Sequence, residues 1–124
     1  PGDIHTLAIT ADGTARFDAA VGADDALGEL AVTAATIRID GAVVTTDAGT
    51  GSGDGGQHYT GAVLLGADTT LTTGGTADEN IVVTGTLNSA DLEGRSLTLN
   101  TGTDGDIVFT GPGHIGNEAG GALG

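Results

Sequence analysis

Short stretches in which apolar and polar residues alternate run through the whole chain. The apolar positions recur two residues apart, as in Leu7/Ile9, Ala15/Phe17, Leu30/Val32, Ile37/Ile39, Val63/Leu65, Ile81/Val83, Leu97/Leu99 and Ile107/Phe109, and Val43 alternates with Thr45 in the same way. A period of two is that of a β-strand with one face turned to a core. Turn signals such as Asp12-Gly13 and Asp40-Gly41 separate the stretches. The pattern predicts an all-β fold of short strands. Glycines interrupt the two helix candidates, residues 18–30 and 89–95.

Two parts of the chain share an order of apolar and glycine residues. Leu7-Ala8-Ile9-Thr10 has a counterpart in Leu97-Thr98-Leu99-Asn100, Val21-Gly22 in Ile115-Gly116, and Ala26-Leu27-Gly28 in Ala122-Leu123-Gly124. The second part lacks only a final strand like residues 30–33 (LAVT), and residues 7–10 (LAIT) supply a similar one. We therefore expect residues 1–124 to form a single repeat unit whose ends are contiguous with neighbouring copies, either covalently in a tandem array or non-covalently in a stack.

A strand–turn–strand unit that cannot bury its apolar face alone is typical of a solenoid, in which each coil covers the next. The sequence thus predicts a parallel β-helix, or β-solenoid. Coils of about 20 residues would give about six coils, and a spacing of about 4.8 Å would make the stack roughly 30 Å long. A β-sandwich with donor-strand exchange stays open, because exchange of a terminal strand also explains ends that complement each other.

Two segments of the sequence resemble those of a known group of proteins. Residues 61–72 (GAVLLGADTTLT) and 97–102 (LTLNTG) resemble the repeats of giant bacterial surface proteins. These are the filamentous-haemagglutinin-like and autotransporter-like adhesins, which are built as right-handed parallel β-helices. The likeness runs from about Leu7 to Phe109. It implies a β-helix fold, an extracellular location and an adhesive or scaffolding role, and it carries over no catalytic residue.

The amino-acid composition limits which residues can fill the core and which partners the chain can bind. The chain has 24 Gly, no Cys, Met or Trp and only three aromatic residues, so Val, Ile, Leu and Ala must fill a thin, layered core. A formal net charge of −14 argues against nucleic-acid binding, which requires clusters of Lys and Arg. No apolar run is long enough to span a bilayer, so membrane insertion is not expected. The three arginines, Arg16, Arg38 and Arg95, are expected to point outward and pair with carboxylates on adjacent coils or subunits.

Acidic and histidine residues are the candidates for chemistry. The carboxylate pairs are Asp24/Asp25, Asp78/Glu79 and Asp91/Glu93, and the histidines are His5, His58 and His114. Sugar-cleaving β-helices need converging carboxylates and aromatic platforms, and the histidines lack metal-site spacing. We therefore expect a solvated acidic rim and no enzyme. If the ends adjoin, His5 and His114 lie near one joint, as candidates for a shared metal or a pH-sensitive contact.

Residues 51–57 (GSGDGGQ) resemble the glycine- and aspartate-rich nonapeptides that bind calcium in parallel β-rolls. Such a site needs tandem copies and the segment occurs once, so we expect a flexible loop that bulges from the solenoid. The neighbouring His58 and Tyr59 are candidates to flank a ligand, with a solvated turn as the simpler expectation. No cofactor is expected. Calcium is the candidate cation, with Asp54, Asp78 and Glu79 as its candidate ligands.

The ends of the predicted solenoid carry no evident cap, since no amphipathic helix or lysine edge protects them. The residues expected to form an assembly interface are Leu7, Ile9, Leu97, Leu99, Ile107, Phe109 and Leu123. The predicted function is that of a structural subunit of an extracellular bacterial filament or adhesin stalk, partnered head-to-tail with itself. A surface glycan or host receptor is a candidate external partner. The alternatives are a passive covalent stalk repeat of a giant adhesin and a carbohydrate-binding β-helix.

Overall fold

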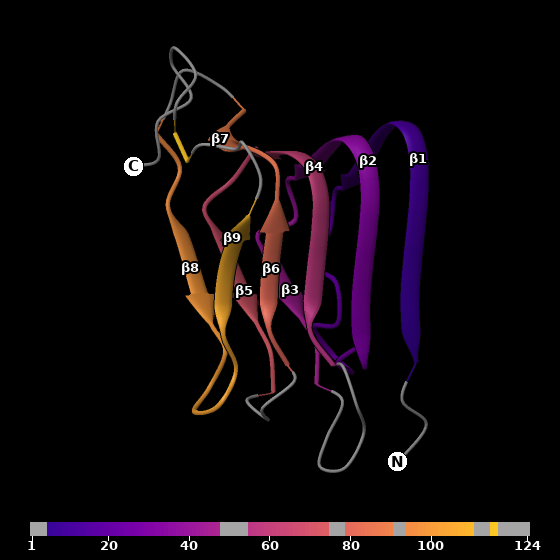
Figure 1. Ribbon diagram of the computed structural model, residues 1–124, viewed down its shortest axis with the longest axis vertical. Helices are drawn as coiled ribbons and strands as arrows, with labels where there is room; N and C mark the ends of the chain where they lie inside the picture. The colour runs from indigo at the N-terminus through magenta and orange to yellow at the C-terminus, as the bar shows by residue number, and fades with distance from the viewer. Residues whose placement is uncertain (1–4, 48–54, 75–78, 91–93, 111–114, 117–124) are drawn as a thin grey trace.

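The chain folds as a stack of parallel strands. The computed structural model describes residues 5–47, 55–74, 79–90, 94–110 and 115–116 (Figure 1). The strands are β1 (Thr6–Phe17), β2 (Glu29–Ile39), β3 (Val43–Thr45), β4 (Gln57–Leu65), β5 (Thr69–Thr72), β6 (Ile81–Thr84), β7 (Leu87–Ser89), β8 (Leu97–Asn100) and β9 (Ile107–Thr110). No helix occurs in the described residues, as the alternation predicts.

Two parallel sheets face each other across the core. The long sheet has the order β1-β2-β4-β6-β9, with β7 also paired to β4, and the short sheet has the order β3-β5-β8 (Figure 1). Every strand pairing is parallel. The molecule is therefore a β-solenoid of about four turns. This confirms the predicted β-solenoid, and the wholly parallel pairing contradicts the β-sandwich alternative.

The coils are longer and fewer than the sequence predicted. Partners in successive strands lie between 22 residues apart, as for Thr14 and Thr36, and 28 apart, as for Thr69 and Leu97. Five strands stack in the path of the long sheet, so its outermost described strands are about 19 Å apart at the usual strand spacing. The prediction of about six coils of about 20 residues was wrong, because loops and bulges lengthen each coil without adding a strand.

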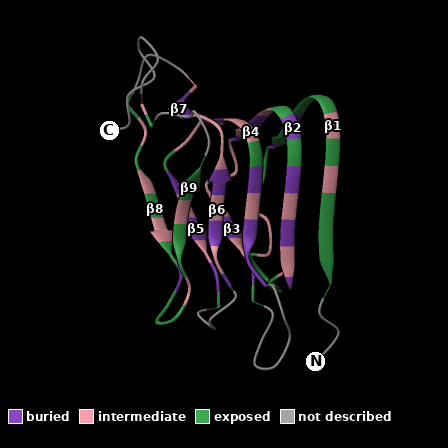
Figure 2. Cartoon of the chain, in the orientation of Figure 1, coloured by how far each residue is buried: buried purple, intermediate pink, exposed green. Residues whose placement is uncertain are grey.

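Side chains of the same column stack on one another along the core. One column of the long sheet contains Leu7, Leu30, Gln57, Ile81 and Ile107. A second contains Ile9, Val32, Tyr59, Val83 and Phe109. The short sheet contributes Val44 and Leu71 to the core. Figure 2 shows buried positions alternating along β2, β4 and β6, while β1 and β9 are mostly exposed.

One strand has the opposite phase from the predicted one. The sequence pattern grouped Val43 with Thr45 as the inward pair, but in β3 Val44 is the buried residue and its two neighbours are half-buried. In a three-residue strand that begins with two valines, either phase presents an apolar residue to the core. The phase was set by pairing, since Val44 lies beside Leu71 of β5.

Candidate functional site at the two ends of the solenoid

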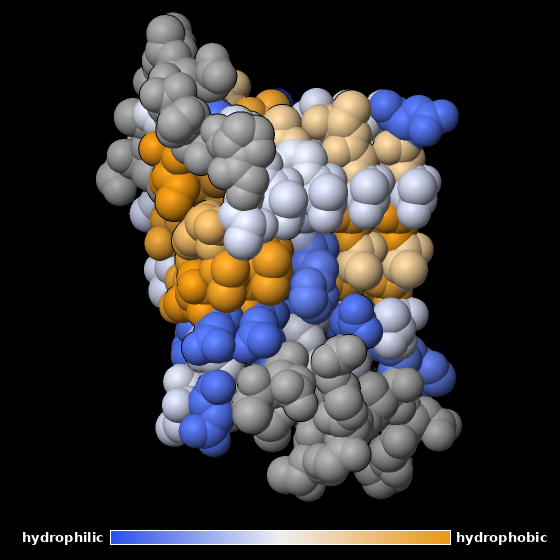
Figure 3. Space-filling view, in the orientation of Figure 1, coloured by the Kyte–Doolittle hydropathy of each residue, from blue (hydrophilic) through white to orange (hydrophobic). Residues whose placement is uncertain are grey.

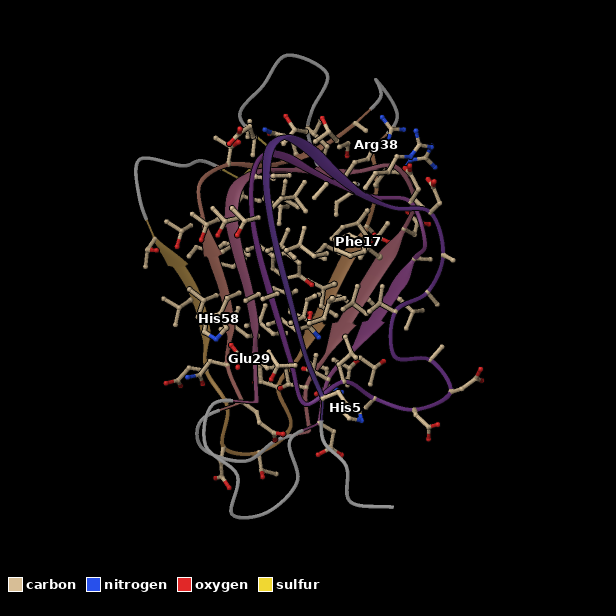
Figure 4. All side chains as sticks on the ribbon, turned by 90° about the vertical axis from the view of Figure 1, so that its right-hand side faces the viewer. His5, Phe17, Glu29, Arg38 and His58 are labelled. Carbon is tan, nitrogen blue, oxygen red and sulfur yellow. The ribbon has the colours of Figure 1, made fainter. Side chains whose placement is uncertain are left out.

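The first end of the stack is the outer edge of β1. Among the described residues β1 pairs with β2 alone, so its other edge is open. Leu7 is 37% exposed and Ile9 is half-buried, whereas their column neighbours Leu30 and Val32 are buried. Figure 4 views the molecule from this end. The first coil thus presents core side chains and an unpaired strand edge to solvent.

The second end is formed by β9 and Ile115. Ile107, Phe109 and Ile115 are 44%, 41% and 51% exposed, although the residues beneath them, Ile81, Val83 and Leu87, are fully buried. In Figure 3 apolar surface appears on the side of the molecule that β8 and β9 occupy. The columns that run from Leu7 to Ile107 and from Ile9 to Phe109 are therefore open at both described ends, whereas Ala15 and Phe17 of β1 are buried.

The structure divides the predicted interface residues between these two ends. Leu7 and Ile9 lie on β1, Ile107 and Phe109 on β9, and Leu97 and Leu99 on β8, the edge strand of the short sheet. Leu97 and Leu99 are half-buried and pack against the core. Leu123 lies outside the described residues.

The predicted equivalence of residues 7–10 and 97–100 was wrong. Residues 97–100 belong to the short sheet, and residues 107–110 are the ones that share columns with residues 7–10. Both sheets contain short strands in which every second residue is apolar. A two-residue period therefore cannot tell which sheet a strand joins.

A column of threonines runs along the outer face of the long sheet. Its members, one per strand, are Thr10, Thr33, Thr60, Thr84 and Thr110. The hydroxyl oxygens of Thr84 and Thr110 are 2.9 Å apart, which is hydrogen-bonding distance. Thr10 and Thr110, at the two terminal strands, are both exposed. The same residue type thus occupies this column at both ends of the stack.

A small charged cluster lies beside the first end. Arg16 and Arg38 are neighbours on adjacent strands, and Figure 4 labels Arg38. The Nε–H of Arg16 donates to Asp18 and lies 2.9 Å from Asp40 Oδ2, while the Nε–H of Arg38 donates to both Asp40 oxygens at 3.0 Å. The contact between Arg16 and Asp40 confirms the predicted pairing across adjacent coils for Arg16, whereas Arg38 pairs with Asp40 of its own coil. Arg16 and Asp18 are exposed, so their pair contributes little to stability, whereas Arg38 and Asp40 are partly buried.

Of the three predicted cation ligands, only Glu79 lies in the described residues. Asp54 and Asp78 lie outside the described residues, and no three His, Cys, Asp or Glu side chains gather among the described ones. Glu79 is fully buried, so its placement in a solvated acidic rim was wrong. Its backbone is held by the hydroxyl of Thr73, which donates to the Glu79 carbonyl oxygen at 2.6 Å. Calcium binding stays a prediction.

The described histidines lie apart on different elements. His58 is half-buried on the outer face of β4, between Ala31 and Val82 of the neighbouring strands, and His5 is exposed just before β1 (Figure 4). His114 lies outside the described residues. His58 is thus a strand residue, which corrects its interpretation as part of a solvated turn.

Gln57 and Tyr59 form a buried polar pair that the sequence pattern did not reveal. The Gln57 side-chain amide donates to the carbonyl oxygens of Val44 and Thr72, at 3.2 and 2.9 Å, and so joins the long sheet to two strands of the short one. The Tyr59 hydroxyl donates to Gln57 Oε1 at 2.7 Å, and burial raises the pKa of Tyr59 well above its usual value. Both residues belong to β4, not to a loop. The signal was their period-two spacing from Val63 and Leu65.

Comparisons with known proteins found no match among protein-family models, curated proteins or solved structures. In the part of the chain that the structure describes, no helix has the length and apolar character needed to cross a membrane.

Proposed function

We propose that this chain is a structural segment of an extracellular bacterial filament or adhesin stalk, in which copies stack end to end. The observation that carries the proposal is the open core at both ends. Leu7 at one end and Ile107 and Phe109 at the other are more than a third exposed, although their columns are closed everywhere between. A parallel strand edge with apolar side chains is a template for another strand.

In a stack, one type of contact, between the last coil of one copy and the first coil of the next, would cover both open ends. The edges of β1 and β9 differ from each other, so the contact is heterologous and translates each copy along the solenoid axis, which generates an open fibre. Each junction would bury the exposed apolar side chains and add ladder hydrogen bonds of the type made inside the stack. The role is mechanical, and the proposal assigns no catalytic step to the chain.

The acidic composition suits fibres that stay separate in solution. The net charge of −14 keeps the sides of neighbouring fibres apart. The extracellular location follows from the resemblance to bacterial surface proteins. The same charge favours a cation such as calcium as a bridge between fibre sides. A surface glycan or receptor is the partner that the resemblance to adhesins implies for the assembled stalk. Both are part of the proposal, and neither is needed for stacking.

The direct test is the state of the purified chain. We expect negative-stain electron microscopy to show unbranched filaments as wide as one solenoid, and sedimentation to show mass that grows with protein concentration. A sharp 11.9 kDa species at every concentration would contradict the proposal. If copies are instead joined covalently, the parent gene will contain tandem units of about this length.

A matched pair of variants isolates the open end. Phe109→Lys places a charge in the exposed end of a core column, and we expect it to abolish filaments, because burying an unpaired ammonium at the junction is unfavourable. Thr60→Lys makes the same change on the exposed side of the middle strand β4 and is expected to leave filaments intact. Filaments from Phe109→Lys that match the wild type would contradict the proposed contact.

A further inference from the structure

The spacing between two core columns varies from coil to coil. The first column contains Leu7, Leu30, Gln57, Ile81 and Ile107, and the second contains Ala15, Ile37, Val63, Leu87 and Ile115. The two columns are eight residues apart in the first coil, seven in the second, and six in the third and fourth. Each of the first two decreases in this spacing appears as a register shift of one residue. One shift lies between Ala11 and Thr14 of β1, and the other between Thr33 and Thr36 of β2.

The last described coil returns to the spacing of the first. Ile107 and Ile115 are eight residues apart, as are Leu7 and Ala15. If β9 and Ile115 were placed on β1 of another copy, both columns would continue without a register shift. Among the pairings of the described residues, only that of β4 with β6 and β7 has such equal spacing.

We propose that β9 and Ile115 of one copy pair in parallel with β1 of the next in one fixed register, with Ile107 beside Leu7, Phe109 beside Ile9 and Ile115 beside Ala15. This inference rests on the proposed function and adds to it the identity of the joint. The partner is a second copy of this chain, and the recognition elements are the matching spacing of the two edges and their matching columns.

The outer face supports the same register. It places Thr110 on Thr10, which extends the threonine column from one copy into the next, and Val108 on Ala8, which keeps two apolar residues together. The 2.9 Å hydroxyl contact between Thr84 and Thr110 shows how members of this column interact across neighbouring strands.

Charges do not oppose this register in the described residues. Asp106 precedes Ile107 and would face Thr6, and Gly116 follows Ile115 and would face Arg16. The exposed guanidinium of Arg16, already paired with Asp18 and Asp40, would thus meet a residue without a side chain. No two like charges would be directly opposed.

Other registers lose these matches. A shift by one residue turns Ile107 and Phe109 to the outer face and Val108 and Thr110 to the core side. A shift by two that sets Val108 on Thr10 interrupts the threonine column and places Thr110 against Asp12. The opposite shift by two sets Ile107 on His5 and Ile115 on Gly13. Only the unshifted register keeps both core columns and the threonine column continuous.

Cysteine cross-linking distinguishes these registers, because the native chain has no cysteine. The double variant Thr10→Cys/Thr110→Cys places thiols on directly opposed residues of the two edges, about 4.8 Å apart across the joint, a separation that a disulfide spans. The matched control Thr10→Cys/Val108→Cys tests the register shifted by two, in which only that pair is opposed. Within one copy β1 and β9 are about 19 Å apart, so any disulfide must join two copies.

We expect mild oxidation of Thr10→Cys/Thr110→Cys to give a ladder of covalent oligomers on non-reducing gels, which a reductant collapses to a single band. The Val108 control should give at most about a tenth of that yield, because diagonal neighbours are too far apart for a disulfide. Circular dichroism of both variants in reductant checks that the fold is kept.

The outcomes separate the register from the function. A dominant ladder from the Val108 control, or wild-type filaments with no ladder from either variant, would overturn the register and leave stacking in place. Absence of both wild-type filaments and any ladder would overturn the proposed function together with this joint.

Discussion

Gln57 and Tyr59 are polar residues buried in a core that is filled mainly by aliphatic side chains. Gln57 occupies a column position where other coils have Leu or Ile, and its amide reaches carbonyl oxygens of β3 and β5. A buried amide without partners would be costly, so these bonds fix where the short sheet lies against β4. Tyr59 completes the group by donating to Gln57 Oε1.

Alkaline pH should destabilise the fold through Tyr59. An unfolded tyrosine titrates near pH 10, whereas burial raises the pKa of Tyr59 in the folded state. Above about pH 10 the unfolded state therefore binds fewer protons than the folded state, and stability falls as pH rises, by up to about 1.4 kcal/mol per pH unit. The chain has no Lys or Cys and no other Tyr, so no other side chain should titrate in this range. Urea unfolding between pH 8 and 11, ranges chosen around the tyrosine value, measures the slope.

Tyr59→Phe is the matched variant for this pH dependence. It leaves Gln57 Oε1 without its donor, so we expect a loss of roughly 1–3 kcal/mol at neutral pH. The alkaline slope should disappear, because the titrating group is gone. An unchanged slope in the variant would show that Tyr59 is not its source.

At the scale of elements, two glycines with positive φ lie where the backbones of successive coils approach each other closely. Gly61 in β4 has φ +138° and Gly85, just after β6, has φ +133°. A Cβ on Gly61 would lie 1.9 Å from the Ala34 carbonyl oxygen, and one on Gly85 would lie 2.2 Å from that of Gly61. The backbones of successive coils approach each other so closely here that no side chain fits.

Gly61→Ala is expected to destabilise the protein by about 2–4 kcal/mol, because strain at positive φ adds to a clash with backbone. Gly13→Ala is the control, since a Cβ there meets nothing within 4 Å and the residue is exposed. Denaturant unfolding of both variants measures the difference. Equal stabilities would mean that the backbone at Gly61 moves aside at little cost.

At the scale of the whole molecule, attraction at the two ends competes with repulsion between acidic copies. The ends present apolar side chains and unpaired strand edges, while every copy contributes a net charge of −14. Long-range repulsion opposes the approach of copies, and short-range burial holds them once they meet. Solution conditions should therefore control assembly without changing the fold.

Raising the salt concentration should promote filament growth. The screening length falls from about 10 Å at 0.1 M salt to about 3 Å at 1 M, which removes most of the repulsion and leaves apolar burial intact. Lowering the pH toward the sequence pI of about 4.1 should act in the same direction. Light scattering across a salt series measures the growth rate. A rate that falls with salt would show that ion pairs, and not the apolar columns, hold the joint.

The amino-acid sequence by itself determined the secondary structure type and the core-facing side of most strands. The two-residue alternation predicted strands and no helix, and it identified most of the residues that face the core, among them Leu30, Ile37 and Val63. These properties depend only on neighbours along the chain and on the apolar character of each side chain. The open ends of the stack follow in part from the same reasoning, because the alternation alone marks Leu7, Ile107 and Phe109 as apolar residues of strands near the ends.

Only the tertiary structure decided which strands lie together. It assigned residues 97–100 to the short sheet, turned Val44 inward, buried Gln57 and Glu79, and gave both ends the same eight-residue spacing. The physical reason is that alternation specifies a face of a strand but not its neighbour. The neighbour is set by the length of each coil and by the column that its side chains complete, and both are known only once the coils are stacked.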